Sequence, residues 1–222
     1  ERIVLPRLVD AVESALYILD SIEKDLVWGL IDRTTTAEWG SADVKDAFPN
    51  TPVRPADRRA QCYKAFGEYY VSDSLVFGAG PSPLIWGRLA AWLARIGQAL
   101  FDFRELQLQL YVDDPLWVTR GTAEQRRRNT VILLMFWQAF GFPLSWPKSQ
   151  TAPEVQWIGA TLRIVNSSPK GRGVRVEVPE EKQEAVLTEV KSLRSSNVVG
   201  RRILRKLVGQ MSVIAGLVPH LG

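Results

Sequence analysis

Cysteine and histidine are nearly absent from this sequence. Among its 222 residues there is one cysteine, Cys62, and one histidine, His220. A single cysteine cannot form a disulfide within the chain and is typical of a reducing compartment. A single histidine argues against a histidine-based zinc site or nucleophile.

Long apolar runs are also missing. No stretch is long enough to span a membrane, and we find no signal peptide, internal repeat or low-complexity tract. We therefore expect a chain that is not secreted and has no membrane partner. The glycosylation-like triplet Asn166-Ser167-Ser168 is then a chance match.

The composition is that of a folded domain with a mild excess of positive charge. Hydrophobic residues make up 46% and charged residues 23%, with a net charge of +4. Residues 163–222 hold eleven Lys and Arg against five Asp and Glu, more than the whole excess. This length allows one sizeable core, or one domain with an appendage, and the charge favours a polyanionic partner.

Two carboxylates stand at the centre of the most regular stretch. Leucine and glutamine alternate from Leu106 to Leu110, Asp113-Asp114-Pro115 breaks the pattern, and residues 116–118 resume it. Such alternation predicts a half-buried strand, so we expect a hairpin with the carboxylates at its tip. An ordinary polar turn is the alternative, because Asp and Pro are common in turns.

A third carboxylate has a similar setting. We expect residues 41–48 to form a short strand that carries Asp43, with Asp46 outside the catalytic set. Three carboxylates from two adjacent strands suit hard divalent cations, which take oxygen ligands. Two such ions held together are a common apparatus for in-line phosphoryl transfer.

These motifs resemble those of a known enzyme family. Tyr111-Val112-Asp113-Asp114 resembles the catalytic hairpin of reverse transcriptases, and residues 43–48 resemble their first catalytic motif, about seventy residues earlier. The resemblance extends from about Leu5 to the end of the chain. The family that the chain resembles is the reverse transcriptase domain of a retrotransposon or retrovirus-like pol protein, and the element could be DIRS-like.

The resemblance implies an RNA-directed DNA polymerase that adds deoxynucleotides to a primer 3′ end. Its partners would be an RNA or DNA template with primer and deoxynucleoside triphosphates, inside the cell, in the cytoplasm, the nucleus or a virus-like particle. Asp43, Asp113 and Asp114 would be catalytic and would hold two Mg²⁺ ions, or Mn²⁺. Lys148 would lie near the departing pyrophosphate, although a plain surface lysine is the alternative.

The resemblance also implies binding residues. Val44 and Phe48 would lie under the incoming nucleotide, where the Phe48 ring would exclude a 2′-hydroxyl; otherwise it is a core aromatic. The remaining residues are Phe77 and Gly78 for nucleotide positioning, Trp157, Ile158 and Gly159 as the primer grip, and Arg201, Arg202, Arg205 and Lys206 along the nucleic-acid backbone.

We therefore expect an α+β fold, with a ferredoxin-like polymerase palm, an antiparallel sheet backed by helices, and a helical thumb fragment. Residues 1–40 would be a lead-in helix with residual fingers, 41–165 the palm and 166–222 the thumb fragment. The basic fingers would lie upstream of Leu5 and be largely missing, so we expect slow or no extension by the chain alone.

Local patterns predict the individual elements. We expect a helix over residues 7–24, a surface loop with Arg33 over 25–40, a meander over 51–76, a helix capped by Ser82, and a strand over 172–178. A helix over 122–140 should open with a Thr122–Gln125 capping box. We expect it to have a solvated start at Arg126, Arg127 and Arg128 and to bury Val131, Leu134, Met135, Gln138 and Ala139.

Two helices should end the chain. The first opens at Pro179-Glu180-Glu181, and the second starts near Val198 and buries Ile203, Leu204, Leu207, Met211 and Ile214.

Two other functions stay open. The first is an RNA-dependent RNA polymerase, which shares the palm, although Val112 and Phe48 argue against it. The second is a non-catalytic nucleic-acid-binding remnant of a decayed element, against which the three intact carboxylates argue.

Overall fold

The computed structural model describes residues 5–168, 171–194 and 200–217, so His220 and Val198 lie outside it. In these ranges no helix combines the length and apolar character needed to cross a membrane. The helices are α1 (Leu8–Val27), α2 (Ser82–Ala99), α3 (Ala123–Ala139), α4 (Glu180–Arg194) and α5 (Arg201–Leu217), with short 3-10 helices η1 (Pro55–Gln61) and η2 (Trp146–Lys148). The strands are β1 (Thr36–Ser41), β2 (Cys62–Ala65), β3 (Glu68–Val71), β4 (Leu106–Tyr111), β5 (Asp114–Gly121), β6 (Gln150–Ala152), β7 (Glu154–Trp157), β8 (Ala160–Val165) and β9 (Gly173–Glu177).

The central sheet has the order β4-β5-β1-β6, and all its neighbouring strands are antiparallel. With α2 before β4 and α3 after β5, this is the β-α-β-β-α-β arrangement of a ferredoxin-like fold. A second antiparallel sheet, β7-β8-β9, lies beside it, and β2 and β3 form a separate ribbon. The predicted α+β fold is confirmed.

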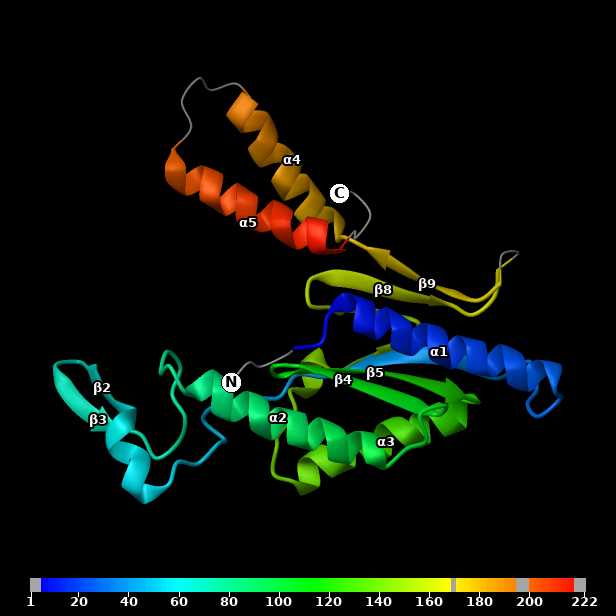
Figure 1. The fold of residues 1–222 in the computed structure, drawn as a ribbon, viewed down its shortest axis with the longest axis horizontal. Coiled ribbons are helices and arrows are strands. Elements are labelled where there is room, and N and C mark those ends of the chain that lie inside the picture. The colour runs from blue at the N-terminus through cyan, green and yellow to red at the C-terminus, as the bar shows by residue number, and fades with distance from the viewer. Residues whose placement is uncertain (1–4, 169–170, 195–199, 218–222) are drawn as a thin grey trace.

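Helices cover the central sheet on both faces. The α2 and α3 helices lie along one face, and α1 lies on the other, between the central sheet and the second sheet (Figure 1). Each face has its own apolar cluster, because β5 is buried on both sides. Leu116 and Val118 belong to the cluster under α1, and Trp117 to the cluster over α2 and α3.

Gly40 makes room for Trp117 in the middle of the sheet. A Cβ atom on Gly40 would lie 2.0 Å from the indole of Trp117, which pairs with it across β1 and β5. No side chain fits at that distance, so the position needs glycine. The two strands that lead to the predicted carboxylates are thereby locked in register.

The first helix is longer than its pattern predicts. It begins at Leu8, where the Arg7 backbone N–H donates to the Asp10 carboxylate at 2.6 Å, and continues to Val27. The expected surface loop over 25–40 is therefore wrong at both ends, because β1 begins at Thr36. Asp25 is buried and pairs with Arg104 and Arg120, whereas Arg33 lies in the exposed part that remains a loop.

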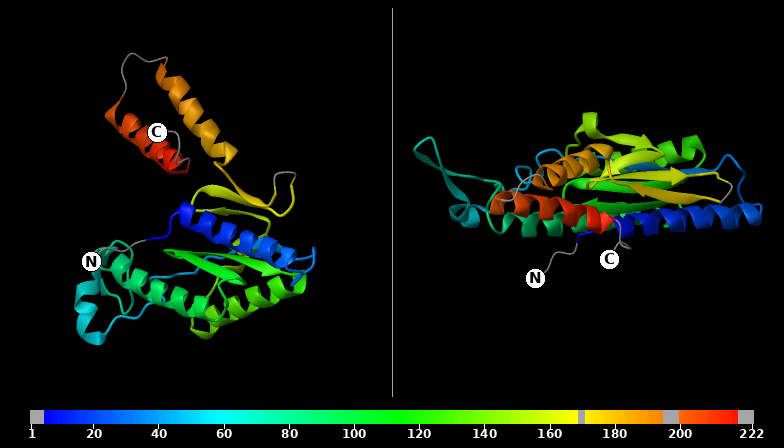
Figure 2. Two further views of the ribbon diagram at one scale, coloured as in Figure 1. Left: turned by 45° about the vertical axis from the view of Figure 1, so that its right-hand side comes forward. Right: turned by 90° about the horizontal axis from the view of Figure 1, so that it is seen from above.

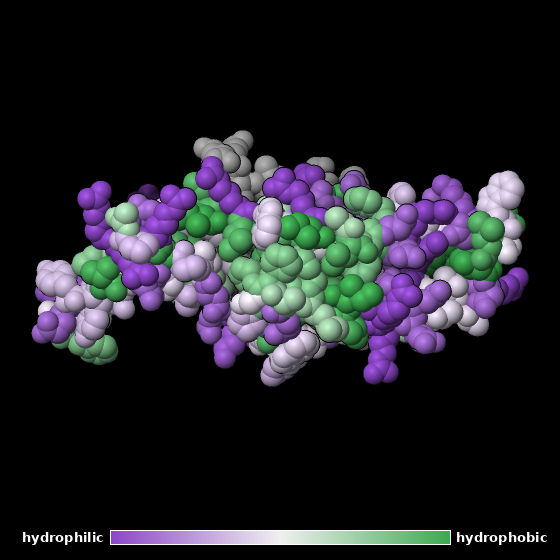
Figure 3. Space-filling view, turned by 90° about the horizontal axis from the view of Figure 1, so that it is seen from below, coloured by the Kyte–Doolittle hydropathy of each residue, from purple (hydrophilic) through white to green (hydrophobic). Residues whose placement is uncertain are grey.

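The buried side of α3 is also different from the prediction. The Thr122–Gln125 capping box is present, but the buried residues are Asn129, Thr130, Leu133 and Trp137. Val131 and Met135 are exposed. The face seen from below, over α2 and α3, carries a broad apolar surface (Figure 3). Arg126 is not solvated: its guanidinium pairs with Glu38, and the side chain is 13% exposed.

Two further local predictions are wrong. The strand that we expected over 41–48 ends at Ser41, because the backbone turns at residues 45–50, where the side-chain amide of Asn50 donates to the Lys45 carbonyl. Within residues 42–48, which the structure describes, only Val44 forms a β-bridge, and its partner is Leu144. Ser82 does not cap α2; Pro81 is the cap residue, and the Ser82 hydroxyl is buried.

The α4 and α5 helices form an arm beyond the second sheet (Figures 1 and 2). They pack on each other, and Lys206 pairs with Glu189 between them. Leu207 is buried as expected, but Ile203, Leu204 and Met211 are about half exposed, so that part of the prediction is wrong. The side chain of Ile214 is outside the described part.

Candidate active site

The β4–β5 hairpin carries the two adjacent carboxylates at its turn, as predicted. Tyr111 and Asp114 are the last strand pair, which leaves Val112 and Asp113 as the turn. Val112 has a φ of 54°, an unusual value for a β-branched residue. Such a backbone costs about 1–3 kcal/mol and persists only where its surroundings hold it.

The segment after β1 is tied to this hairpin. The Ala42 amide donates to the Pro115 carbonyl at 3.1 Å, and the Val44 amide donates to the Asp113 carbonyl at 2.9 Å. Asp43 lies between these two bonds, and its own carbonyl accepts from the Ser145 amide at 2.8 Å. Backbone bonds on both edges therefore fix Asp43 beside the paired carboxylates.

Lys148 completes a charged group around Asp43. Its Nζ lies 3.1 Å from Asp43 Oδ2, and the lysine side chain is 66% exposed while the aspartate side chain is 20% exposed. The ammonium therefore supplies a mobile positive charge at the edge of the carboxylate group. The structure brings together Asp43, Asp114 and Lys148, which the sequence predicted as one site.

The surroundings of Asp114 oppose its ionisation. Burial, together with the negative charges of Asp113 and Asp43, raises the pKa of Asp114 to about 6, and the positive charge of Lys148 acts in the opposite direction. A cation placed here would relieve this repulsion.

These residues line a cleft of about 660 Å³. Asp43, Asp114 and Lys148 form one side, and the tip of the β7–β8 hairpin, with Trp157 and Ile158, forms another. Gln156 also lines the cleft, and we did not predict it. Its place between Val155 and Trp157 in an alternating strand was the only signal, since alternation puts it on the side opposite the core.

The predicted primer-grip hairpin turns sharply beside the carboxylates. Ile158 and Gly159 have φ values of 37° and 90°, as a two-residue hairpin turn needs. The Trp157 indole donates to the Asp114 carbonyl at 3.1 Å, and Lys182 of α4 donates to the Gly159 carbonyl at 3.2 Å. This hairpin therefore contacts both the carboxylate turn and the arm.

The predicted nucleotide-binding residues divide into two groups. Phe48 and Phe77 meet, with ring centroids 4.9 Å apart, and Gly78 follows in the same exposed turn. The Val44 side chain is only 2% exposed and belongs to the core.

The basic residues of α5 are not part of this cleft. Arg201, Arg202 and Arg205 are exposed on the arm, and Lys206 is engaged with Glu189. They lie beyond the second sheet, away from the central one (Figure 2).

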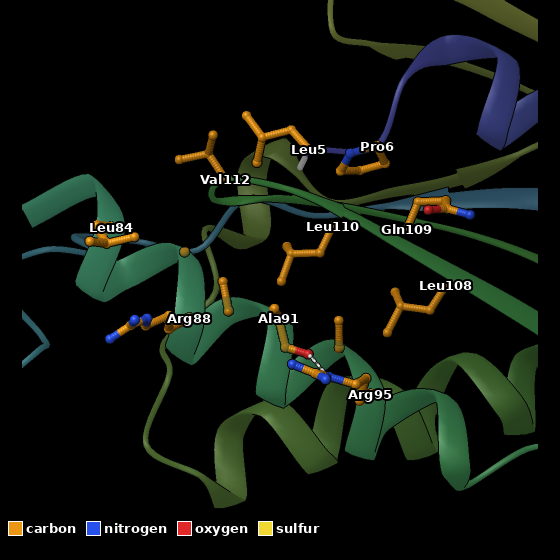
Figure 4. A pocket seen from close by; sticks show the side chains of 13 residues that line it. Leu5, Pro6, Leu84, Arg88, Ala91, Arg95, Leu108, Gln109, Leu110 and Val112 are labelled. Atoms are coloured by element: carbon orange, nitrogen blue, oxygen red, sulfur yellow. Dashed lines mark hydrogen bonds between the residues drawn. The ribbon is translucent and has the colours of Figure 1, made fainter. Parts of the chain in front are cut away.

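A second pocket lies on the other side of the turn. It measures about 430 Å³ and lies between α2 and β4, with Leu110 and Val112 on one wall and Arg88, Ala91 and Arg95 on the other (Figure 4). Arg95 donates to the Ala91 carbonyl of its own helix, at 3.1 Å. None of the predicted site residues lines this pocket.

The carboxylate cleft fits a hard divalent cation in charge and in donor type. Such an ion takes oxygen ligands, which the carboxylates supply. Its positive charge would also relieve the repulsion between them. As the side chains lie, no group of three or more His, Cys, Asp or Glu in the described ranges is arranged as a ready metal site. The Asp43 carboxylate is turned to Lys148, so ion binding needs a side-chain rotation there, a change that binding often involves.

No family model and no curated protein matches this sequence. Solved structures match its fold. One is the foamy viral protease-reverse transcriptase in complex with RNA/DNA hybrid, with a TM-score of 0.57 and 16% identity over 80% of this chain and 21% of that one. Another is the foamy viral protease-reverse transcriptase in complex with dsDNA, with a TM-score of 0.55 and 17% identity over 79% of this chain and 32% of that one. The chain thus spans at most 32% of these proteins, and it has a reverse transcriptase-like fold.

Proposed function

We propose that this chain is the polymerase core of an RNA-directed DNA polymerase from a retroelement pol protein. The observation that carries the proposal is that Asp43 and Asp114 line one cleft together with Trp157 and Ile158 of the β7–β8 hairpin, with Asp113 next to Asp114 in the turn. A cleft with a carboxylate floor and a hairpin wall suits a primer 3′ end. The complexes with RNA/DNA hybrid and dsDNA among the proteins of similar fold support a primer–template as the partner.

In this proposal Asp43, Asp113 and Asp114 hold two divalent ions, Mg²⁺ or Mn²⁺. When bound, the ions would acidify the primer 3′-hydroxyl and neutralise the leaving pyrophosphate. Lys148, next to Asp43, adds a positive charge and a proton where the pyrophosphate departs. The hairpin tip with Trp157 orients the primer end, and positioning supplies much of the rate.

The division of the chain follows the same proposal. Residues 41–165 would be the palm, 1–40 the lead-in and 166–222 the thumb, whose arm would follow the duplex backbone. Phe48, with Phe77 against it, would face the sugar of the incoming deoxynucleotide.

Asp113→Asn tests the proposal because it removes one charge and keeps the shape of the side chain. We expect primer extension on an RNA template with deoxynucleotides and Mg²⁺ to be abolished, while the Kd for the duplex stays within about twofold, since basic residues dominate binding. Asp46→Asn is the matched control, because Asp46 is an exposed carboxylate three residues after Asp43 with a φ of 52°, which asparagine tolerates.

Extension by the Asp113→Asn variant at the parent's rate would overturn the metal-site proposal. A parent that binds the duplex but extends it with neither nucleotide type, also in a version lengthened at its N-terminus by the native upstream segment, would favour the non-catalytic remnant. Preferential use of ribonucleotides would favour an RNA polymerase.

A further inference from the structure

Three consecutive carbonyls in the carboxylate turn each accept a hydrogen bond from a different part of the chain. The Asp113 carbonyl accepts from the Val44 amide and the Asp114 carbonyl from the Trp157 indole. The Val112 carbonyl accepts from Nε1 of Trp86, on α2, at 2.9 Å. The peptide planes on both sides of each carboxylate are therefore held by groups outside the hairpin.

Trp86 combines a core position with this one polar contact. Its side chain is fully buried and packs on Phe142, with ring centroids 5.8 Å apart. A buried indole N–H needs an acceptor, and here the acceptor is the carbonyl immediately before Asp113. A side chain of α2 thus holds Val112, the residue that immediately precedes Asp113.

The turn depends on such bonds because its own conformation is unfavourable. Val112 is held at a positive φ, which a β-branched residue avoids. Val112 packs partly against the apolar cluster that contains Trp86 and also lines the pocket beside α2, so packing holds it on one side only (Figure 4). The hydrogen bonds to the turn therefore add positioning that packing does not supply.

We propose that Trp86 is a positioning residue of the polymerase: its indole N–H holds the Val112 carbonyl and thereby aims the Asp113 carboxylate. The inference rests on the proposed function. Trp86 itself would touch neither the nucleotide nor an ion, because its ring is buried.

The test is Trp86→Phe, which keeps an aromatic ring and removes the donor. We expect kcat for nucleotide addition to fall by about 100-fold, the scale of a misplaced catalytic group, with KM for the deoxynucleotide and Kd for the duplex nearly unchanged. Trp92→Phe is the matched control: Trp92 lies on the same helix, is half exposed and packs on Phe140. It should keep the parent's kcat.

A second substitution separates positioning from general damage. Glycine adopts positive φ without strain. The Val112→Gly, Trp86→Phe double variant should therefore have a kcat about tenfold higher than Trp86→Phe alone. NMR relaxation dispersion of the Asp113 and Asp114 amides should show new microsecond–millisecond exchange in Trp86→Phe and none in Trp92→Phe.

Two outcomes would overturn the inference while leaving the proposed function intact. One is a Trp86→Phe variant as active as Trp92→Phe. The other is a loss of activity with unchanged Asp113 and Asp114 amides and no rescue by Val112→Gly. The proposed function is tested by a different experiment, and it fails if the Asp113→Asn variant extends primers at the parent's rate.

Discussion

Phe48 and Phe77 form a ring pair in the segments between β1 and α2. Phe48 is partly buried against the core over α2 and α3, and Phe77 is 74% exposed, so the pair has one anchored ring and one open ring. An anchored ring five residues after Asp43 has the rigidity that exclusion by shape requires.

We therefore expect Phe48→Ala to admit ribonucleotides. The ratio of kcat/KM for a ribonucleotide to that for the matching deoxynucleotide should rise at least about tenfold. Phe103→Ala, at an exposed phenylalanine before β4, is the control and should leave the ratio unchanged. If the ratio does not change in Phe48→Ala, Phe48 contributes only to core packing and does not select the sugar.

At the scale of elements, one buried carboxylate joins α1 to the sheet. Asp25 accepts from Arg120 of β5 and from Arg104, both at 2.6 Å, and its side chain is 6% exposed. Burial alone would raise the pKa of this carboxyl, but the two guanidinium groups outweigh it and hold the pKa below its usual value. The ionised form therefore stabilises the packing of α1 on the sheet.

Asp25→Asn should lower the free energy of unfolding by about 2 kcal/mol at pH 7, less than a fully buried pair because Arg104 is half exposed. Asp20→Asn, in an exposed pair with Lys24, should change it by less than about 0.5 kcal/mol. Urea denaturation measures both.

The pH dependence follows from the lowered pKa of Asp25. Its contribution is complete above the unfolded pKa, about 3.9, and is lost as the pH falls through the folded value. The difference between parent and Asp25→Asn should therefore persist at pH 5 and shrink toward pH 2. A difference that is constant over this range would show that the charge is not the cause.

Elements with strong local signals could be predicted from the sequence. The Leu–Gln alternation of β4 and the Thr122–Gln125 box are local chemistry, and the structure has both. The buried side of α3 was not predictable, because apolar residues such as Met135 also lie on an exposed surface. Periodicity alone cannot tell a core face from such a surface.

The placement of Asp43 beside the Asp113–Asp114 turn was predictable from residue type and spacing. The Lys148–Asp43 pair spans 105 residues, and no local pattern encodes it. The Trp86 bond was likewise hidden, because a tryptophan on an apolar helix face gives no sign that its N–H has a specific acceptor. Such contacts depend on tertiary packing.

At the scale of the whole molecule, the arm of α4 and α5 extends away from the sheets (Figure 1). Arg201, Arg202 and Arg205 are exposed at the start of α5, whereas Lys206 is already paired with Glu189. The three arginines are therefore better placed than the lysine to meet phosphates.

Replacing Arg201, Arg202 and Arg205 together by Gln should weaken duplex binding equally for all sequences. The slope of log Kd against log salt should fall by about 2 to 3, since each phosphate contact contributes about 0.9. Replacing the exposed Arg127 and Arg128 of α3 is the control and should leave the slope nearly unchanged. Equal slopes in both variants would rule out the arm as the phosphate-binding surface.

The three carbonyl contacts of the carboxylate turn also bear on how the chain folds. Their donors lie in segments before and after the hairpin, with Trp86 26 residues from its acceptor and Trp157 43 residues from its own. Each contact closes a long loop, and the chain leaves the ribosome N-terminus first, so the turn emerges before its last donor exists. The hairpin can form early, but its carboxylates take their final direction only after residue 157 has been added and β7 has docked.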